Sequence, residues 1–124
     1  MGNNNVKLAG MQSCNKVGQL IAFYNELNIG VEFVKMGFHI GVGGVVTFSN
    51  SKRIKKVVQD IPIENIVLET DAPYLAPVPF RGKRNTSALL PYVVEAIAEL
   101  KGMEAEDVIR ITEENARRMY RITA

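Results

Sequence analysis

The chain has 124 residues with a single cysteine, so it is long enough for one domain with a core and cannot form an internal disulfide. Hydrophobic residues make up 47% of it and charged residues 23%, a balance typical of globular rather than disordered proteins. The formal net charge of +2 is too small to indicate nucleic-acid binding by itself. Because no apolar run approaches about 20 residues and the N-terminus has no secretory pattern, we expect a cytoplasmic protein without a membrane anchor.

Residues 1–30 predict an atypical N-terminal segment that is partly helical. It begins with a polar stretch rich in glycine and asparagine, which is typical of a tail or a loose loop. Apolar residues then recur at helical spacing over residues 17–27, and this pattern predicts an amphipathic helix that ends before Asn28 or Gly30.

The middle of the chain predicts a strand, a helix and a second strand. After a further helical turn that Gly37 is expected to stop in the left-handed conformation, residues 38–42 predict the first strand. A helix is expected over about residues 51–59, with Ser49 or Asn50 as its cap and with Ile54, Val57 and Val58 on its apolar side. The second strand follows directly. Such a succession within about thirty residues is typical of a parallel βαβ unit with a right-handed crossover.

The second strand, over residues 65–71, carries two acids. Its β-branched, apolar start is typical of a buried parallel strand, and alternation predicts that Glu69 and Asp71 share one face. Carboxylates so close repel each other unless a cation, a proton or a basic side chain lies between them. Asp71 is a candidate site residue because sites in α/β folds form at the carboxyl ends of strands; the alternative is an aspartate that caps the turn into Ala72. Glu69 is expected to point inward, where a structural salt bridge explains it as well as a catalytic role does.

A proline-rich loop follows and ends in a basic cluster formed by Arg81, Lys83 and Arg84. The guanidinium groups offer planar forks that suit phosphate, which makes this loop a candidate substrate-binding segment. The alternative is an ordinary solvated loop. Two explanations also exist for Tyr74 and Phe80: each ring could stack on a nucleobase or pack against neighbouring side chains.

The remainder of the chain predicts helices. One is expected over about residues 88–101, ending at Gly102, with Leu90, Val94, Ile97 and Ala98 as its apolar stripe. Two short ones are expected over about residues 105–111 and 113–120. Thr112 is a suitable N-cap for the last of them.

Two further features are expected to be structural. His39, the only histidine, lies at the start of a strand, which is the wrong end for a site in this kind of fold. Gly41, Gly43 and Gly44 resemble a phosphate-binding loop only superficially, because they lack the Lys-Ser/Thr pair of that motif.

Several segments, all in the same order, resemble the C-terminal half of the TatD family of metal-dependent hydrolases. The most specific are Glu-Thr-Asp-Ala-Pro-Tyr-Leu and the Arg-Gly-Lys-Arg-Asn that follows it; the full set is Phe33–Ile40, Gly44–Phe48, Leu68–Pro77, Arg81–Asn85 and Thr112–Ala116. The resemblance covers residues 31–124 and implies an α/β fold, namely the last two strand-helix units of a (β/α)8 TIM-type barrel. Residues 1–30 do not resemble the family.

The resemblance also implies a chemistry. Members of the family are deoxyribonucleases and related phosphoesterases that bind divalent metal ions (Mg, Mn or Zn) at the C-terminal mouth of the barrel. Asp71 matches the last-strand aspartate, a metal ligand that also orients or deprotonates the attacking water. Arg81, Lys83 and Arg84 would help to bind the DNA backbone, and Glu69 would support the site from a layer below.

The other ligands of the family are a His-x-His pair, a glutamate and two further histidines, for which a chain with one histidine has no counterpart. We therefore expect a truncated chain that is inactive alone. Its possible partners are a separate polypeptide that supplies the missing N-terminal half, or further copies of this chain through self-association. The alternative is a non-catalytic remnant or half-barrel interaction module that binds nucleic acid weakly.

Overall fold

The computed structural model describes residues 27–122, so most of the helix expected over residues 17–27 lies outside the described part. Among residues 27–122 no helix has the length and apolar character that a membrane crossing requires. The elements are α2 (Leu27–Lys35), β1 (Ile40–Val42), α3 (Lys52–Asp60), β2 (Ile66–Leu68), α4 (Leu90–Lys101) and α5 (Ala105–Met119), with short 3-10 turns at Gly44–Thr47, Ile63–Asn65 and Ser87–Leu89.

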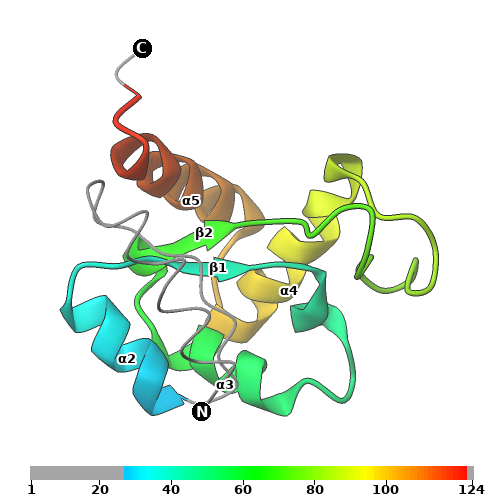
Figure 1. Cartoon of the computed structure of the whole chain (residues 1–124), viewed down its shortest axis with the longest axis horizontal. Coiled ribbons are helices and arrows are strands. Elements are labelled where there is room, and N and C mark those ends of the chain that lie inside the picture. The colour runs from blue at the N-terminus through cyan, green and yellow to red at the C-terminus, as the bar shows by residue number, and fades with distance from the viewer. Residues whose placement is uncertain (1–26, 123–124) are drawn as a thin grey trace.

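The two strands form a parallel pair at the centre of the molecule (Figure 1). Ile40 lies opposite Ile66 and Val42 opposite Leu68, and α3 connects the strands along the chain. The predicted parallel βαβ unit is therefore confirmed. Both strands are short apolar runs, which is the composition expected of strands that are buried on both faces.

The core lies where the helices pack against these strands. The apolar stripe of α3 is buried as the periodicity predicts, and α4 buries a stripe that also includes Val93, which the sequence pattern did not single out. Core side chains in this region include Ile40, Val42, Ile54, Val57, Val58, Ile61, Ile66, Val93, Val94, Ile97 and Val108.

The first described helix differs from its prediction. α2 covers Leu27–Lys35 and includes Asn28 and Gly30, so the helix end predicted before these residues was wrong, and one glycine is tolerated inside a helix at modest cost. Gly37 has a φ of 88°, so the left-handed stop predicted there is confirmed. The residue at the N-cap of α3 is Ser51, without a side-chain capping hydrogen bond, and the prediction of Ser49 or Asn50 was wrong.

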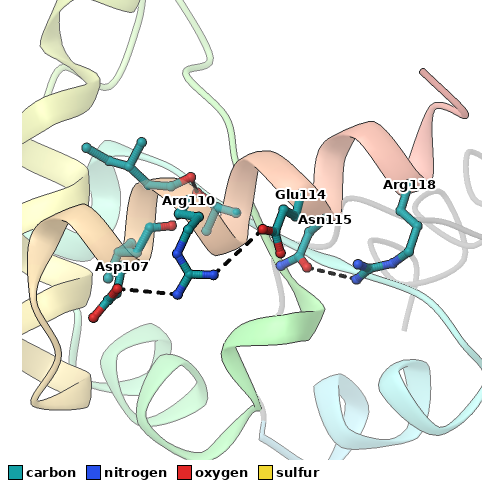
Figure 2. A network of polar contacts seen from close by, with 8 residues as sticks. Asp107, Arg110, Glu114, Asn115 and Arg118 are labelled. Atoms are coloured by element: carbon teal, nitrogen blue, oxygen red, sulfur yellow. Dashed lines mark hydrogen bonds and ion pairs between the residues drawn. The ribbon is translucent and has the colours of Figure 1, made fainter. Parts of the chain in front are cut away.

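The two short helices expected at the C-terminus are one continuous helix, α5, so the predicted break at Thr112 was wrong. The Thr112 hydroxyl donates to the carbonyl oxygen of Val108 at 2.7 Å, one turn back inside the helix. A threonine that bonds backwards in this way is satisfied within a helix and does not begin a new one. Ion pairs of Arg110 with Asp107 and Glu114 cover the outer face of α5 (Figure 2).

The inner face of α5 carries a buried asparagine. Asn115 is 1% exposed, and its Nδ2 donates to the carbonyl oxygens of Ile63 at 2.8 Å and Ile66 at 2.7 Å. Arg118 in turn donates to its Oδ1 at 2.9 Å (Figure 2). Asn115 therefore ties the last helix to the start of β2.

Lys101 performs a similar task at the end of α3. Its Nζ donates to the carbonyl oxygens of Val58 at 2.7 Å and Ile61 at 2.6 Å, groups that a helix end would otherwise leave without partners. Burial lowers the pKa of the Lys101 ammonium, while the carboxylates of Glu64 and Asp60 act in the opposite direction.

His39 lies immediately before β1, away from the carboxyl ends of the strands. Its Nδ1 is buried and has no hydrogen-bond partner within the described residues. Burial lowers the pKa of the imidazole, and the positive charge of Arg118 lowers it further. Both effects favour the neutral form of the imidazole.

Candidate functional site

The second strand ends earlier than the sequence pattern predicts. β2 stops at Leu68, and the N–H of Glu69 makes one more bond across to the carbonyl oxygen of Val42 at 3.0 Å. Asp71 then has a φ of 58°, which is left-handed rather than extended. The alternation of strand residues therefore does not extend to Asp71. The prediction that Glu69 and Asp71 lie on one face of the strand was wrong.

The two acids nevertheless line one cavity of about 520 Å³ beyond the carboxyl ends of the strands. Asp71 is exposed and Glu69 is half-buried. The other described residues that line this cavity are mostly apolar: Gly41, Gly43, Val45, Val46, Ile54, Tyr74 and Leu75. The structure thus places both carboxylates at the edge of the sheet where the sequence predicts a site.

Gly43 lies against the Glu69 side chain. A Cβ at Gly43 would come within 3.0 Å of the Glu69 Oε1 and 3.3 Å of the Glu69 carbonyl oxygen. A side chain at the end of β1 would therefore crowd the Glu69 carboxylate, which would have to shift by a few tenths of an ångström. The inward direction of Glu69 agrees with this close contact, while its supporting role stays a prediction.

A tight turn surrounds Asp71. The Thr70 hydroxyl oxygen accepts a hydrogen bond from the N–H of Ala72 at 3.1 Å, and the Asp71 carbonyl oxygen accepts one from the N–H of Tyr74 at 2.9 Å. The backbone of Asp71 thus belongs to a turn, as the alternative explanation predicts. Its side chain remains exposed at the cavity, so the turn and the candidate site coincide.

Asn85 fixes this turn from outside. The side chain is 3% exposed, and its Nδ2 donates to the carbonyl oxygens of Thr70 and, at 2.8 Å, Tyr74. Its own N–H donates to the carbonyl oxygen of Pro73 at 2.9 Å. Sequence reasoning missed this role, because the partners lie 11 and 15 residues earlier and no local pattern links them.

The loop also packs closely on the short turn that follows β1. A Cβ at Gly44 would collide with the carbonyl oxygen of Leu75 and lie 2.9 Å from the nitrogen of Pro77. The hydroxyl of Thr47 accepts a hydrogen bond from the N–H of Val78 at 2.8 Å. Gly44 therefore serves close backbone packing, which agrees with the rejection of a phosphate-binding loop here.

The basic cluster projects beyond the end of β2, in the loop at the right of Figure 1. Arg81, Lys83 and Arg84 are all exposed. The guanidinium carbon of Arg81 lies 3.9 Å from the centroid of the Phe48 ring, a cation–π arrangement that restrains this side chain. Both explanations of this loop require exposed side chains, and the binding role of the cluster stays a prediction.

The two loop aromatics have different environments. Phe80 packs edge-to-face on Tyr92 with ring centroids 5.2 Å apart, as the packing explanation predicts. Tyr74 is 73% exposed and lines the cavity beside Asp71, so of these two rings it is the one placed to meet a ligand.

The described residues supply only part of a metal site. Within residues 27–122 no three histidine, cysteine, aspartate or glutamate side chains come together in a way that would bind a metal ion. The carboxylates of Asp71 and Glu69 are hard oxygen donors, which suit Mg²⁺ or Mn²⁺, but hydrolytic sites use three or more protein ligands. The chain therefore fits a divalent ion as a contributor of ligands and not as the whole site.

Comparison with known proteins identifies the family. The family model described as TatD related DNase matches residues 19–121. This chain belongs to the TatD family. The match covers most of the sequence, and it includes the β2 end, the basic loop and α5. The boundary expected near residue 30 stays a prediction.

Curated relatives support the same assignment. A Bacillus subtilis (strain 168) protein named uncharacterized metal-dependent hydrolase YabD is 47% identical over 105 residues, which are 85% of this chain and 41% of the relative. The Escherichia coli K12 protein named uncharacterized metal-dependent hydrolase YcfH is 36% identical over 107 residues, 86% of this chain and 40% of that protein. The chain spans about two fifths of the length of these relatives.

Solved structures agree on the fold. The crystal structure of YJJV, a TatD homologue from Escherichia coli K12, matches 97% of this chain and 47% of that chain with a TM-score of 0.82 and 23% sequence identity. The predicted fold class, an α/β chain that corresponds to part of a (β/α)8 barrel of the TatD type, is confirmed.

Proposed function

We propose that this chain forms the last-strand portion of a TatD-type metal-dependent hydrolase that cleaves phosphodiester bonds in DNA, with Asp71 as a ligand of the divalent ion. The observation that supports this most directly is the cavity at the carboxyl ends of β1 and β2, which Asp71 and Glu69 both line. A divalent ion at such a place lowers the pKa of its bound water and neutralises phosphate charge.

The residues of this chain have separate tasks in the proposed site. The exposed Asp71 carboxylate offers oxygen ligands and an acceptor for a proton of the attacking water, and Glu69 supports it from the half-buried position beside Gly43. Arg81, Lys83 and Arg84 bind the phosphodiester backbone, with Arg81 restrained over an aromatic ring. The remaining ligands come from outside the described residues, from a polypeptide equivalent to the N-terminal part of the relatives. A cytoplasmic location is part of the proposal.

Reconstitution of a complete barrel tests this function. The chain would be co-expressed with the N-terminal three fifths, roughly, of YabD, a relative whose remaining part this chain matches at 47% identity. We expect the purified complex to cleave single-stranded DNA with Mg²⁺ or Mn²⁺, and neither polypeptide to do so alone. Asp71→Asn should abolish cleavage, whereas Glu106→Gln, an exposed acid at the start of α5, should leave it unchanged. A complex of native mass in which Asp71→Asn cleaves DNA as well as the unmodified chain would refute the role of Asp71.

A second candidate function is a non-catalytic module that binds nucleic acid through the basic loop. It is favoured by the exposure of Arg81, Lys83 and Arg84 and by the incomplete set of metal ligands in the described residues. Fluorescence anisotropy with labelled single-stranded DNA should then show weak binding with a log–log salt slope of about −0.7 per phosphate contacted. Lys83→Ala should reduce that slope and Lys52→Ala, on α3, should not. Binding without cleavage in the reconstituted complex would favour this candidate over the hydrolase.

A further inference from the structure

We propose that Asn85 is a positioning residue for Asp71: it fixes the turn that carries the carboxylate, so the affinity of Asp71 for a divalent ion depends on the Asn85 amide. The inference rests on the proposed role of Asp71 as a metal ligand. It adds a residue to that site which makes no contact of its own with the metal or the substrate.

The hydrogen bonds of Asn85 enclose Asp71 on both sides. The side-chain amide donates to the carbonyl oxygens of Thr70, just before Asp71, and of Tyr74, three residues after it. The backbone N–H of Asn85 donates to Pro73 between them. One residue, itself 3% exposed, thus makes three bonds to the segment from residue 70 to residue 74.

Asp71 needs such support because its backbone is in an unfavourable region. Its φ of 58° is left-handed, an uncommon conformation for residues other than glycine, which aspartate tolerates better than most and which neighbouring contacts help to maintain. The Asp71 side chain is exposed, so packing does not enforce it. The bonds from Ala72 to Thr70 and from Tyr74 to Asp71 lie within the turn, whereas Asn85 connects the turn to a separate part of the loop.

The chemistry of the side chain explains why an asparagine is suited to this position. A single amide nitrogen carries two hydrogens, and here each has a carbonyl acceptor. Serine could satisfy one carbonyl, aspartate neither of them, and glutamine could satisfy both only if a longer side chain fitted into the same buried space. The variants at Asn85 should therefore rank Asn, then Gln, then Ser, then Asp in how well they maintain the turn.

A ligand that moves by a fraction of an ångström loses affinity, and replacing residues that orient a metal ligand typically costs about 10–100-fold in metal affinity. The consequence is measurable on this chain without a complete enzyme. Mn²⁺ broadens the NMR signals of nearby amides even when it binds weakly, so its apparent affinity at Asp71 can be followed on the ¹⁵N-labelled full chain.

The experiment compares the unmodified chain with Asn85→Ser, Asn85→Gln and Asn50→Ser, the last being an exposed asparagine outside the site. We expect Mn²⁺ to broaden signals around Asp71 in the unmodified chain, Asp71→Asn to remove that effect, and Asn85→Ser to weaken it about tenfold or more. Without metal, Asn85→Ser should also shift the Asp71 backbone signals away from left-handed values while those of β1 and β2 stay in place. Asn50→Ser should change neither readout. Broadening at the carboxylates of α5 serves as the internal reference.

The possible failures are distinguishable. If Mn²⁺ does not broaden the Asp71 region of the unmodified chain, the proposed metal site is wrong. If Mn²⁺ binds there but Asn85→Ser binds equally well, or binds less well with unchanged Asp71 backbone signals, Asn85 does not act by positioning. Should Asn85→Ser fail to fold, Asn85→Gln, which retains both donors on a longer side chain, provides the comparison: displaced Asp71 backbone signals together with an unchanged Mn²⁺ affinity would overturn the geometric argument.

Discussion

Replacing the buried Asn115 with leucine is expected to lower the free energy of unfolding by about 3 kcal/mol. The amide is 1% exposed and donates to Ile63 at 2.8 Å and Ile66 at 2.7 Å. Leucine has a similar size but no donor, so two buried carbonyl oxygens lose a partner. Each loss costs about 1–3 kcal/mol, and the greater apolarity of leucine returns about 1 kcal/mol. Such a loss is a large share of the stability of a small domain.

Urea unfolding followed by far-UV circular dichroism measures this change, provided that the denaturant slope stays the same in both proteins. Asn115→Asp keeps the shape but turns a carboxylate oxygen toward two carbonyls, so it should destabilise at least as much even though Arg118 lies beside it. Glu114→Gln is the matched control, since it removes only an exposed ion pair on the same helix (Figure 2) and should cost less than about 1 kcal/mol. If Asn115→Leu changed stability by less than about 0.5 kcal/mol, the two carbonyls would have other partners and the reasoning would be refuted.

Three further predictions concern packing, helix capping and pH. Gly44→Ala should cost about 1–3 kcal/mol in the same assay, because the new Cβ collides with the carbonyl oxygen of Leu75; an unchanged urea midpoint would contradict that close approach. Lys101→Met should cost about 2 kcal/mol, because it removes the ammonium that donates to carbonyls at the end of α3, and a cost near zero would mean that water replaces it. Because the pKa of His39 is lowered in the folded chain, the unfolded chain is the first to protonate this histidine as the pH falls through the ordinary value of 6.5. The contribution of His39 to the free energy of unfolding is therefore fully present above that value and is lost below it. His39→Gln should therefore flatten stability between about pH 7 and pH 5, and parallel pH curves for the two proteins would exclude this cause.

The sequence predicts those features of the fold that depend on neighbouring residues. Helical periodicity identified the buried stripe of α3, and short apolar runs on either side of it predicted the parallel strand pair. Gly37 and Gly102 have φ values of 88° and 63°, as expected where a helix stops in the left-handed conformation. In each case the cause lies within a few residues of the effect.

Features that depend on distant partners were missed or misjudged. Thr112 was expected to begin a helix, since threonine is a frequent N-cap, yet its hydroxyl is satisfied inside a longer helix whose inner face packs on β2 and the turn before it. Lys101 and Asn115 bond to carbonyls between 40 and 52 residues away. Asp71 lies beyond the carboxyl end of β2, the end that the sequence predicts, but the strand stops at Leu68 and the left-handed turn of Asp71 is bridged by Asn85 from the distant part of the loop.

The buried asparagines Asn115 and Asn85 act at opposite ends of the same strand. Asn115 binds carbonyls at and before the start of β2, next to the core, and Asn85 binds carbonyls beyond its end, next to the cavity. The chemistry is the same at both ends, because one amide nitrogen serves two carbonyl acceptors. The consequences differ, because the start of β2 packs on α5 whereas the segment beyond its end carries an exposed carboxylate. Loss of Asn115 should therefore appear as lost stability, and loss of Asn85 as a displaced Asp71. Asn115 at the start of β2 therefore maintains the fold, whereas Asn85 beyond the end of β2 shapes the candidate site.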